Sequence, residues 1–254
     1  MPPADRIRWT SAARCHVGRV RDVNEDAFLD RPERGLWVVA DGMGGHDAGE
    51  LASRMIVSAI DGLAPCADLT RFIAAARQRL QAVNRQLRAE AAMREVPIIG
   101  STVVVMLGCG PFCAYLWAGD SRIYLYRAGR LMLLSRDHSH AEELRAQGLA
   151  DSEALASAQN LVTRAVGALD TLELDEGSMP VVDGDIFLLC SDGLTNYASE
   201  RDIANTLAAG DCPQAADTLV ELALKGGGRD NITAVVVRAE DSYSADMTVL
   251  NPAL

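Results

Sequence analysis

The stretch that decides the fold is Leu36-Trp37-Val38-Val39-Ala40-Asp41-Gly42-Met43-Gly44-Gly45-His46. Its apolar run predicts a buried β-strand that ends at Asp41 and leads into a glycine-rich turn. A carboxylate at the end of a buried strand is held at the rim of the core, where it can bind a divalent ion. A simple Asp-Gly turn would give the same local sequence. The rest of the chain has to decide between these two interpretations.

The same pattern recurs along the chain. The apolar run 186–190 is followed by Ser191 and Asp192, and the run 115–118 is followed by Gly119 and Asp120. Two further predicted strands begin with acids, one after Asn24-Glu25-Asp26 and one after Asp230-Asn231. If all these acids meet at one edge, strands that begin with an acid must run antiparallel to strands that end with one. The sequence therefore predicts antiparallel sheets and not a doubly wound parallel sheet.

Bulk composition limits the classes of function. The chain has 254 residues, 49% of them apolar, which supports a large core. The net charge is −11, which argues against a nucleic-acid or acidic membrane surface as partner. Residues 1–20 contain no apolar signal segment, and no apolar run approaches the roughly 20 residues of a membrane span. We therefore expect a cytoplasmic protein with no membrane span and no nucleic-acid partner.

The six cysteines form no CxxC pair and no zinc-like spacing with histidine. Cys109 and Cys113 flank Gly110-Pro111, a predicted hairpin turn, and could lie near each other. We expect reduced thiols that pack as small hydrophobic side chains.

Periodicity predicts the remaining elements. Helices are expected over 50–63, over 70–93 with Thr70 as N-cap, over 199–209 with Ser199 as cap, and over 213–225. Strands are expected over 9–17, 171–179 and 185–190, and as a consecutive antiparallel meander over 101–109, 112–118, 122–127 and 130–134. Residues 136–166 are expected to form a helical, loop-rich insertion over the site, with an ordinary surface connection as the alternative. We expect a single domain, residues 1–240, followed by a tail over 241–254.

The acids define the expected chemistry. The candidate ligands are all oxygen donors: Glu25, Asp26, Asp41, Asp120, Asp192, Asp230 and the carbonyl of Gly42. Such a set fits Mg²⁺ or Mn²⁺ better than Zn²⁺ or Cu²⁺. Its mutual repulsion implies at least two ions, which can activate a shared water for attack on phosphorus. Arg21 supplies a planar fork that can bind two phosphate oxygens, and a surface ion pair is its alternative role.

Several motifs together resemble the metal-dependent protein phosphatases of type 2C, the PPM family, especially its bacterial members. They are Arg21-x-x-Asn24-Glu25-Asp26, Asp41-Gly42-Met43-Gly44-Gly45-His46, Gly119-Asp120-Ser121-Arg122, Asp137-His138-Ser139, Leu161-x-Thr163-Arg164-Ala165-x-Gly167, Ser191-Asp192-Gly193-Leu194 and Arg229-Asp230-Asn231-Ile232-Thr233. The resemblance implies an α+β fold in which helices flank a central antiparallel β-sandwich on both faces, as four αββα layers with a flap at about 136–166. It also implies hydrolysis of phosphoserine and phosphothreonine in proteins.

The resemblance further implies a role for each site residue. Asp41 would bridge two Mn²⁺ or Mg²⁺ ions, and Asp192 and Asp230 would complete one of them. Glu25 and the Gly42 carbonyl would bind the other ion, and Asp120 a third. Asp26 would hold metal-bound water or orient Arg21, and Arg21 would bind the phosphate.

Two departures from the family pattern concern proton donation and the flap. Met43 stands where eukaryotic members often carry a histidine proposed as general acid, so the leaving group would be protonated by metal-bound water or by another group. His46 is the nearest candidate, with a structural role at the start of a helix as its alternative. The flap has Ser157-Ala158-Gln159 where a histidine is often found.

The opening segment, Ser11-Ala12-Ala13 ahead of His16-Val17-Gly18, is similar to stand-alone phosphatases that oppose a Ser/Thr kinase in type VI secretion. The expected partners are thus phosphorylated proteins, including a Ser/Thr kinase or its substrate, and the chain is expected to be a monomer. The alternatives are a catalytically silent phosphoprotein-binding regulator and a phosphatase of small phosphoesters.

Overall fold

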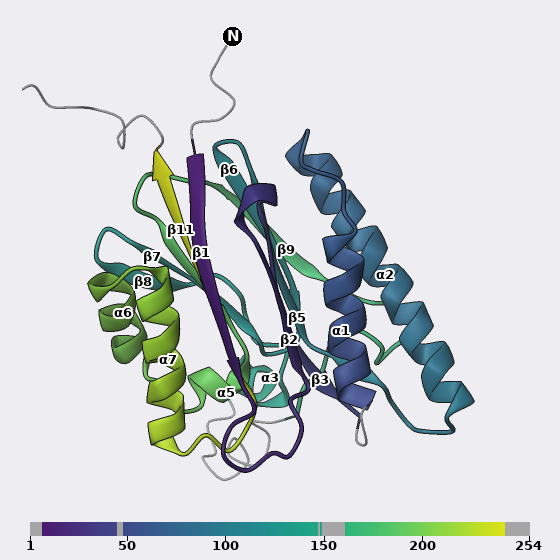
Figure 1. Cartoon of the computed structure of the whole chain (residues 1–254). Helices are drawn as coiled ribbons and strands as arrows, with labels where there is room; N and C mark the ends of the chain where they lie inside the picture. The colour runs from purple at the N-terminus through teal and green to yellow at the C-terminus, as the bar shows by residue number, and fades with distance from the viewer. Residues whose placement is uncertain (1–6, 45–47, 147, 149–160, 242–254) are drawn as a thin grey trace, which may run out of the picture.

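Two antiparallel β-sheets pack face to face, and helices cover the outer face of each (Figure 1). The computed structural model describes residues 7–44, 48–146, 148 and 161–241. Helices α1 (Ala48–Asp61) and α2 (Leu69–Met93) cover one sheet, and α6 (Glu200–Ala209) and α7 (Cys212–Gly226) cover the other (Figure 1). The predicted α+β sandwich is confirmed.

The first sheet has the strand order β1-β11-β10-β7-β8. Its strands are β1 (Ile7–His16), β11 (Ile232–Asp241), β10 (Ile186–Cys190), β7 (Arg122–Arg127) and β8 (Arg130–Leu133). The second sheet has the order β2-β3-β5-β6-β9, and the short strand β4 also pairs with β3. Its strands are β2 (Asp26–Arg31), β3 (Leu36–Met43), β4 (Gly100–Ser101), β5 (Val103–Cys109), β6 (Phe112–Ala118) and β9 (Asp175–Pro180).

Strand β3 is buried on both faces, as the apolar run predicts. Trp37 and Val39 point into the core between the sheets, whereas Val38 and Ala40 point toward α1 and α2. All four side chains have no exposed area. A strand that contributes to two cores has no polar face, so the sequence shows a continuous apolar run instead of an alternating one.

One of the two predicted helix N-caps is confirmed and the other is wrong. Ser199 caps α6 with a complete capping box formed with Asp202, as predicted. The prediction of Thr70 as N-cap of α2 is wrong, because Asp68 holds that position and accepts from the backbone N–H of Arg71 at 2.9 Å. Both residue types cap helices, and an aspartate carboxylate also interacts favourably with the positive end of the helix dipole.

The predicted consecutive meander is wrong at one joint. Strands β5 and β6 pair in the second sheet and β7 and β8 pair in the first, so the chain crosses between sheets at Gly119-Asp120-Ser121. Gly119 has φ +110°, and a Cβ there would lie 2.6 Å from the Cβ of Thr102. Only glycine fits this crossing, which brings Asp120 to the end of the sandwich.

The acids lie at a common end of the sandwich, as the strand polarities predict. Asp26 at the start of β2 is the direct partner of Asp41 near the end of β3. In the other sheet, β10 ends just before Asp192 and its antiparallel partner β11 begins just after Asp230. In Figure 1 this end is the lower one, where the short helix α5 (Asp192–Thr195) lies. Helix α5 was not predicted.

The described parts of the expected flap are anchored to the sheets. Helix α3 (His140–Ala146) lies within it, in agreement with the helical character expected for this insertion. The backbone N–H of His138 donates to Gly119 at 2.9 Å, and Ser101 and Val166 form a β-bridge. Residues 147 and 149–160 of the flap lie outside the described residues. Among the helices that the structure describes, none is long and apolar enough to cross a membrane.

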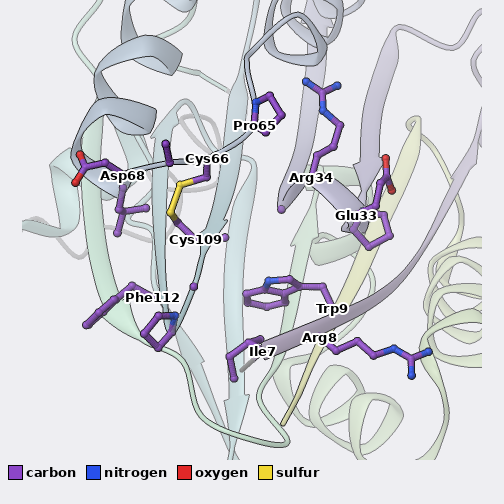
Figure 2. A pocket seen from close by; sticks show the side chains of 17 residues that line it. Ile7, Arg8, Trp9, Glu33, Arg34, Pro65, Cys66, Asp68, Cys109 and Phe112 are labelled. Carbon is purple, nitrogen blue, oxygen red and sulfur yellow. A yellow bond between two sulfur atoms is a disulfide. The ribbon is translucent and has the colours of Figure 1, made fainter. Parts of the chain in front are cut away.

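The expectation of six reduced cysteines is wrong for two of them. Cys66, in the connection from α1 to α2, forms a disulfide with Cys109 at the end of β5. Cys15, Cys113, Cys190 and Cys212 are free, and Cys109 does not pair with Cys113. The disulfide borders a cavity of about 740 Å³ at the end of the sandwich opposite the acids, beside Trp9 and Arg34 (Figure 2). Spacing along the sequence could not reveal a contact across 43 residues.

Removing this disulfide should destabilise the protein without altering the acidic end. The cross-link spans 43 residues, for which loop-closure entropy gives a stabilisation of up to about 4 kcal/mol. We expect Cys66→Ala/Cys109→Ala to lower the free energy of unfolding by about 2–4 kcal/mol in denaturant titrations. Wild type in reducing agent should match the variant. Equal stability with and without reductant would contradict the cross-link.

Candidate metal and phosphate site

The site is built from the strand ends of both sheets. The second sheet contributes Glu25, Asp26, Asp41 and the Gly42 carbonyl, and the first contributes Asp192 and Asp230. Asp120 joins from the crossing between the two sheets. Among the described residues, the structure thus brings the acids singled out from the sequence to one end of the sandwich, where their charges act on one another.

Asp26 has two carboxylate oxygens in different surroundings. The side chains of Ser191 and Thr233 donate to Oδ2 at 2.8 and 2.6 Å. Oδ1 is buried and has no hydrogen-bond partner. Burial, together with the charges of Asp192 and Asp230, raises the pKa of Asp26 to about 7. A buried carboxylate oxygen without a partner is costly, so this atom suits a cation or a polar ligand.

The buried acids Asp41 and Asp192 act on each other through their charges, although they come from different sheets. Burial, and next the charge of Asp26, raises the pKa of Asp41 well above its ordinary value. Burial, and next the charge of Asp230, also raises the pKa of Asp192. Asn196 donates to Asp192 Oδ2 at 3.2 Å, whereas Asp192 Oδ1 is buried without a partner. Buried acids that repel one another are stabilised when they take up a proton or bind a cation.

Arg21 pairs with Asp230 and not with Asp26. Its Nε lies 2.9 Å from Asp230 Oδ1, and its Nη2 donates to Asp230 Oδ2 at 2.9 Å. In this structure Asp230 therefore holds Arg21, whereas Asp26 Oδ2 accepts from the hydroxyls of Ser191 and Thr233. The Arg21 side chain is 53% exposed, so its guanidinium can reach a ligand from solvent while staying beside the acids.

Glu25 lies against the first turn of α1. A Cβ on Gly49 would lie only 2.4 Å from Glu25 Oε1, so the carboxylate occupies space that only a glycine leaves free. The backbone N–H of Glu25 donates to Asn231 Oδ1 at 2.8 Å, and its carbonyl accepts from Gly42 at 3.2 Å. These bonds fix Glu25 between the two sheets.

Asp120 extends the acidic cluster toward the flap. It is 8% exposed, and burial, followed by the charges of Asp192 and Asp137, raises its pKa to about 7. Asp120 and Asp192 line a small cavity of about 70 Å³ together with Asp137. Arg122 donates to both oxygens of Asp137 at 2.7–3.2 Å and so neutralises that acid.

The oxygen donors of this site are chemically suited to bind divalent cations. Among the described residues, no three histidine, cysteine, aspartate or glutamate side chains are already gathered as a ready-made metal site. Part of the negative charge of the acids is instead offset by Arg21, and part is reduced because raised pKa values favour the neutral carboxyl groups. Two carboxylate oxygens, Asp26 Oδ1 and Asp192 Oδ1, stay buried without partners. Hard oxygen donors in this state match Mg²⁺ or Mn²⁺.

Two sequence predictions stand apart from this cluster. His46, the candidate general acid, lies outside the described residues. Met43 ends β3 and has no group that could donate a proton to a substrate. No role was predicted for the supporting residues Ser191, Asn231 and Thr233. Their places in the motifs could have indicated one, since Ser191 precedes Asp192 and the other two follow Asp230 by one and three residues.

Comparison with known proteins identifies the class. The family model described as Protein phosphatase 2C matches residues 17–221, so the chain belongs to this family. The serine/threonine protein phosphatase PstP of Mycobacterium tuberculosis is 36% identical over 239 residues, which cover 91% of this chain and 45% of the relative. The chain thus spans about half the length of that mycobacterial relative.

Solved structures agree with this assignment. PppA, described as a key regulatory component of T6SS in Pseudomonas aeruginosa, is 46% identical, with a TM-score of 0.86 over 91% of this chain and 97% of that one. The catalytic domain of the serine threonine protein phosphatase PstP, in complex with two manganese ions, is 33% identical. It has a TM-score of 0.84 over 92% of this chain and 100% of that one.

The raised pKa values predict an unusual pH dependence of stability without metal. Burial raises the pKa of Asp26 from 3.8, its ordinary value in an unfolded chain, to about 7 in the folded state. Between these values the folded state binds more protons than the unfolded state, so stability falls as the pH rises toward 7. In chelator, we expect the unfolding temperature to drop between about pH 4 and 7, the range between the two pKa values, and Asp26→Asn to reduce that drop. Asp183→Asn, on an exposed turn, is the matched control. Identical pH profiles for the two variants would contradict this account.

Proposed function

We propose that this chain is a protein serine/threonine phosphatase that uses Mn²⁺ or Mg²⁺ to hydrolyse phosphoserine and phosphothreonine in proteins. The observation that carries the proposal is the convergence of acids from both sheets at one end of the sandwich, beside an exposed arginine. Membership of the protein phosphatase 2C family and the relatives named as serine/threonine phosphatases support it. The phosphatase domain is inferred to be residues 1–240, with the flap at about 136–166.

Five of the six acids, all except Asp26, are given a direct role in holding metal. Asp41 would be shared between two ions, Asp192 and Asp230 would complete one of them, and Glu25 with the Gly42 carbonyl would hold the other. The two manganese ions of the PstP structure support this stoichiometry. Asp120 would hold a third ion, since it is buried beside Asp192 at the small cavity.

When bound, such ions supply positive charge to the phosphoryl oxygens and activate water for attack at phosphorus. Arg21 would bind two phosphate oxygens, a role to which its planar fork is suited. Asp230 keeps this guanidinium beside the acids, at a contact of 2.9 Å. Because Met43 cannot protonate the leaving group, His46 is assigned as the candidate general acid.

The natural substrates are inferred to be phosphorylated proteins, including a bacterial Ser/Thr kinase or its targets. The likeness to PppA, a component of T6SS, supports a place beside such a kinase in type VI secretion. The cytoplasmic location and the monomeric state expected from the sequence stay predictions.

Two alternatives make different predictions. A silent phosphoprotein-binding relative would need a lost ligand, yet each acid position is filled. A phosphatase of small phosphoesters would bind the same phosphate group, because the acids and Arg21 recognise phosphate and not its leaving group. Comparing kcat/KM for a phosphothreonine peptide and for a small aryl phosphate separates the three functions.

Catalysis should require divalent metal and Asp192. We expect phosphate release from a phosphothreonine peptide in Mn²⁺, none in chelator, and a loss of at least about 100-fold in kcat for Asp192→Ala. Removing one of several repelling acids should leave the metal-free variant at least as stable as wild type. Asp183→Asn serves as control. Undiminished turnover in chelator, or in Asp192→Ala, would refute the assignment.

Arg21→Ala should mainly weaken substrate binding. A charged hydrogen bond to phosphate is worth about 1.5–3 kcal/mol, so KM should rise by about 10- to 100-fold. Loss of the exposed ion pair with Asp230 should cost at most about 1 kcal/mol of stability. Arg21→Lys should recover only part of the affinity, since lysine lacks the planar fork. An unchanged KM in Arg21→Ala would rule out the phosphate-binding role.

A further inference from the structure

Two buried hydroxyls connect the sheets at the acidic end. Ser191 follows β10 and Thr233 lies in β11, both in the first sheet, whereas Asp26 begins β2 of the second. Both hydroxyls donate to the same oxygen, Asp26 Oδ2, at 2.8 and 2.6 Å. Neither residue has any exposed area. Asp26 is therefore held from the opposite sheet by two charge-assisted hydrogen bonds.

The direction of each hydrogen bond is determined by the remaining contacts. Ser191 Oγ accepts from the backbone N–H of Thr233 at 3.0 Å and so has its proton available for Asp26. Thr233 also gives its one proton to Asp26, so its contact of 2.9 Å with Cys15 Sγ must have the thiol as donor. Asn24 in turn donates to Cys15 Sγ at 3.0 Å. The chain of donors runs from Asn24 through Cys15 and Thr233 to Asp26.

This arrangement leaves one oxygen of Asp26 for the site. Oδ2 is occupied by two donors, and Oδ1 is buried without a partner. Asp26 faces Asp41 across the β2–β3 pair. The hydroxyls belong to the segments that carry the other ligands, since Ser191 precedes Asp192 and Thr233 follows Asp230 by three residues.

We propose that Ser191 and Thr233 are positioning residues. They hold Asp26 Oδ2 so that Oδ1 faces the metal site, and they keep the ligand-bearing ends of the two sheets in place relative to each other. The inference rests on the proposed function, because it assigns these hydroxyls to the same metal site. In a purely structural role, the two hydroxyls would only supply hydrogen bonds to a buried carboxylate. The two roles predict different results when a hydroxyl is replaced by a methyl group of the same shape, because only the positioning role predicts weaker Mn²⁺ binding and a lower kcat.

The test compares Thr233→Val, Thr233→Ser and wild type by calorimetric Mn²⁺ titration, by kcat and KM on a phosphothreonine peptide, and by thermal unfolding in chelator. Outer-shell partners of metal ligands typically contribute 10- to 100-fold in affinity or activity. We expect Thr233→Val to weaken Mn²⁺ binding and lower kcat by about 10-fold or more with little change in KM, and Thr233→Ser to restore both. Thr206→Val, whose hydroxyl bonds only a helix carbonyl among the described contacts, is the matched control.

The outcomes separate this inference from the proposed function. Wild-type Mn²⁺ affinity and kcat in Thr233→Val, or a lowered unfolding temperature with both unchanged, would overturn the positioning role and leave the phosphatase proposal standing. If wild type binds Mn²⁺ but hydrolyses no phosphopeptide, the proposed phosphatase function is contradicted. The Mn²⁺ titration of Thr233→Val then still decides whether the positioning role holds. Should Thr233→Val not fold, Ser191→Ala carries the same comparison, because it removes the other donor to Oδ2.

Discussion

Like charges repel, and this fold brings several of them to one end of a rigid sandwich. Asp41 and Asp192 come from different sheets, yet the charge of Asp192 helps to raise the pKa of the buried Asp41. The apolar cores on both faces of β3 prevent the strand from moving to relieve the repulsion. The protein therefore responds chemically, through raised pKa values and through the pairing of Arg21 with Asp230. Bound cations would add positive charge and relieve the same repulsion, and under the proposed function they would also supply the catalytic site.

The supporting polar groups explain how such an arrangement stays ordered. Asn231 donates to the carbonyls of Val17 and Val23 at 2.9 and 3.0 Å and accepts from Glu25, so one buried side chain closes the loop that carries Arg21. The interactions that hold the loop, the acids and the two sheets meet within a few residues of β11. This common anchor lets ligands far apart in sequence share one site.

Much of this could be predicted from residues alone. A buried strand ending at Asp41, and acids that begin some strands and end others, were sufficient to predict antiparallel sheets with a shared acidic end. The crossing at Gly119 could not be predicted, because adjacent strands such as β6 and β7 carry no local mark of the sheet they join. The Cys66–Cys109 disulfide and the Arg21–Asp230 pair depend on contacts between segments 43 and 209 residues apart. Asp68 and Thr70 are both suitable caps, so only the helix itself decides between them.

The central claim is that acids from both sheets form one site for divalent cations. Equilibrium titration of the metal-free chain with Mn²⁺ tests it most directly, with Asp41→Ala beside wild type. The account predicts at least two bound ions per wild-type chain and loss of this binding in Asp41→Ala, with the fold retained by circular dichroism. Wild-type stoichiometry in Asp41→Ala, or no Mn²⁺ binding by wild type, would contradict it.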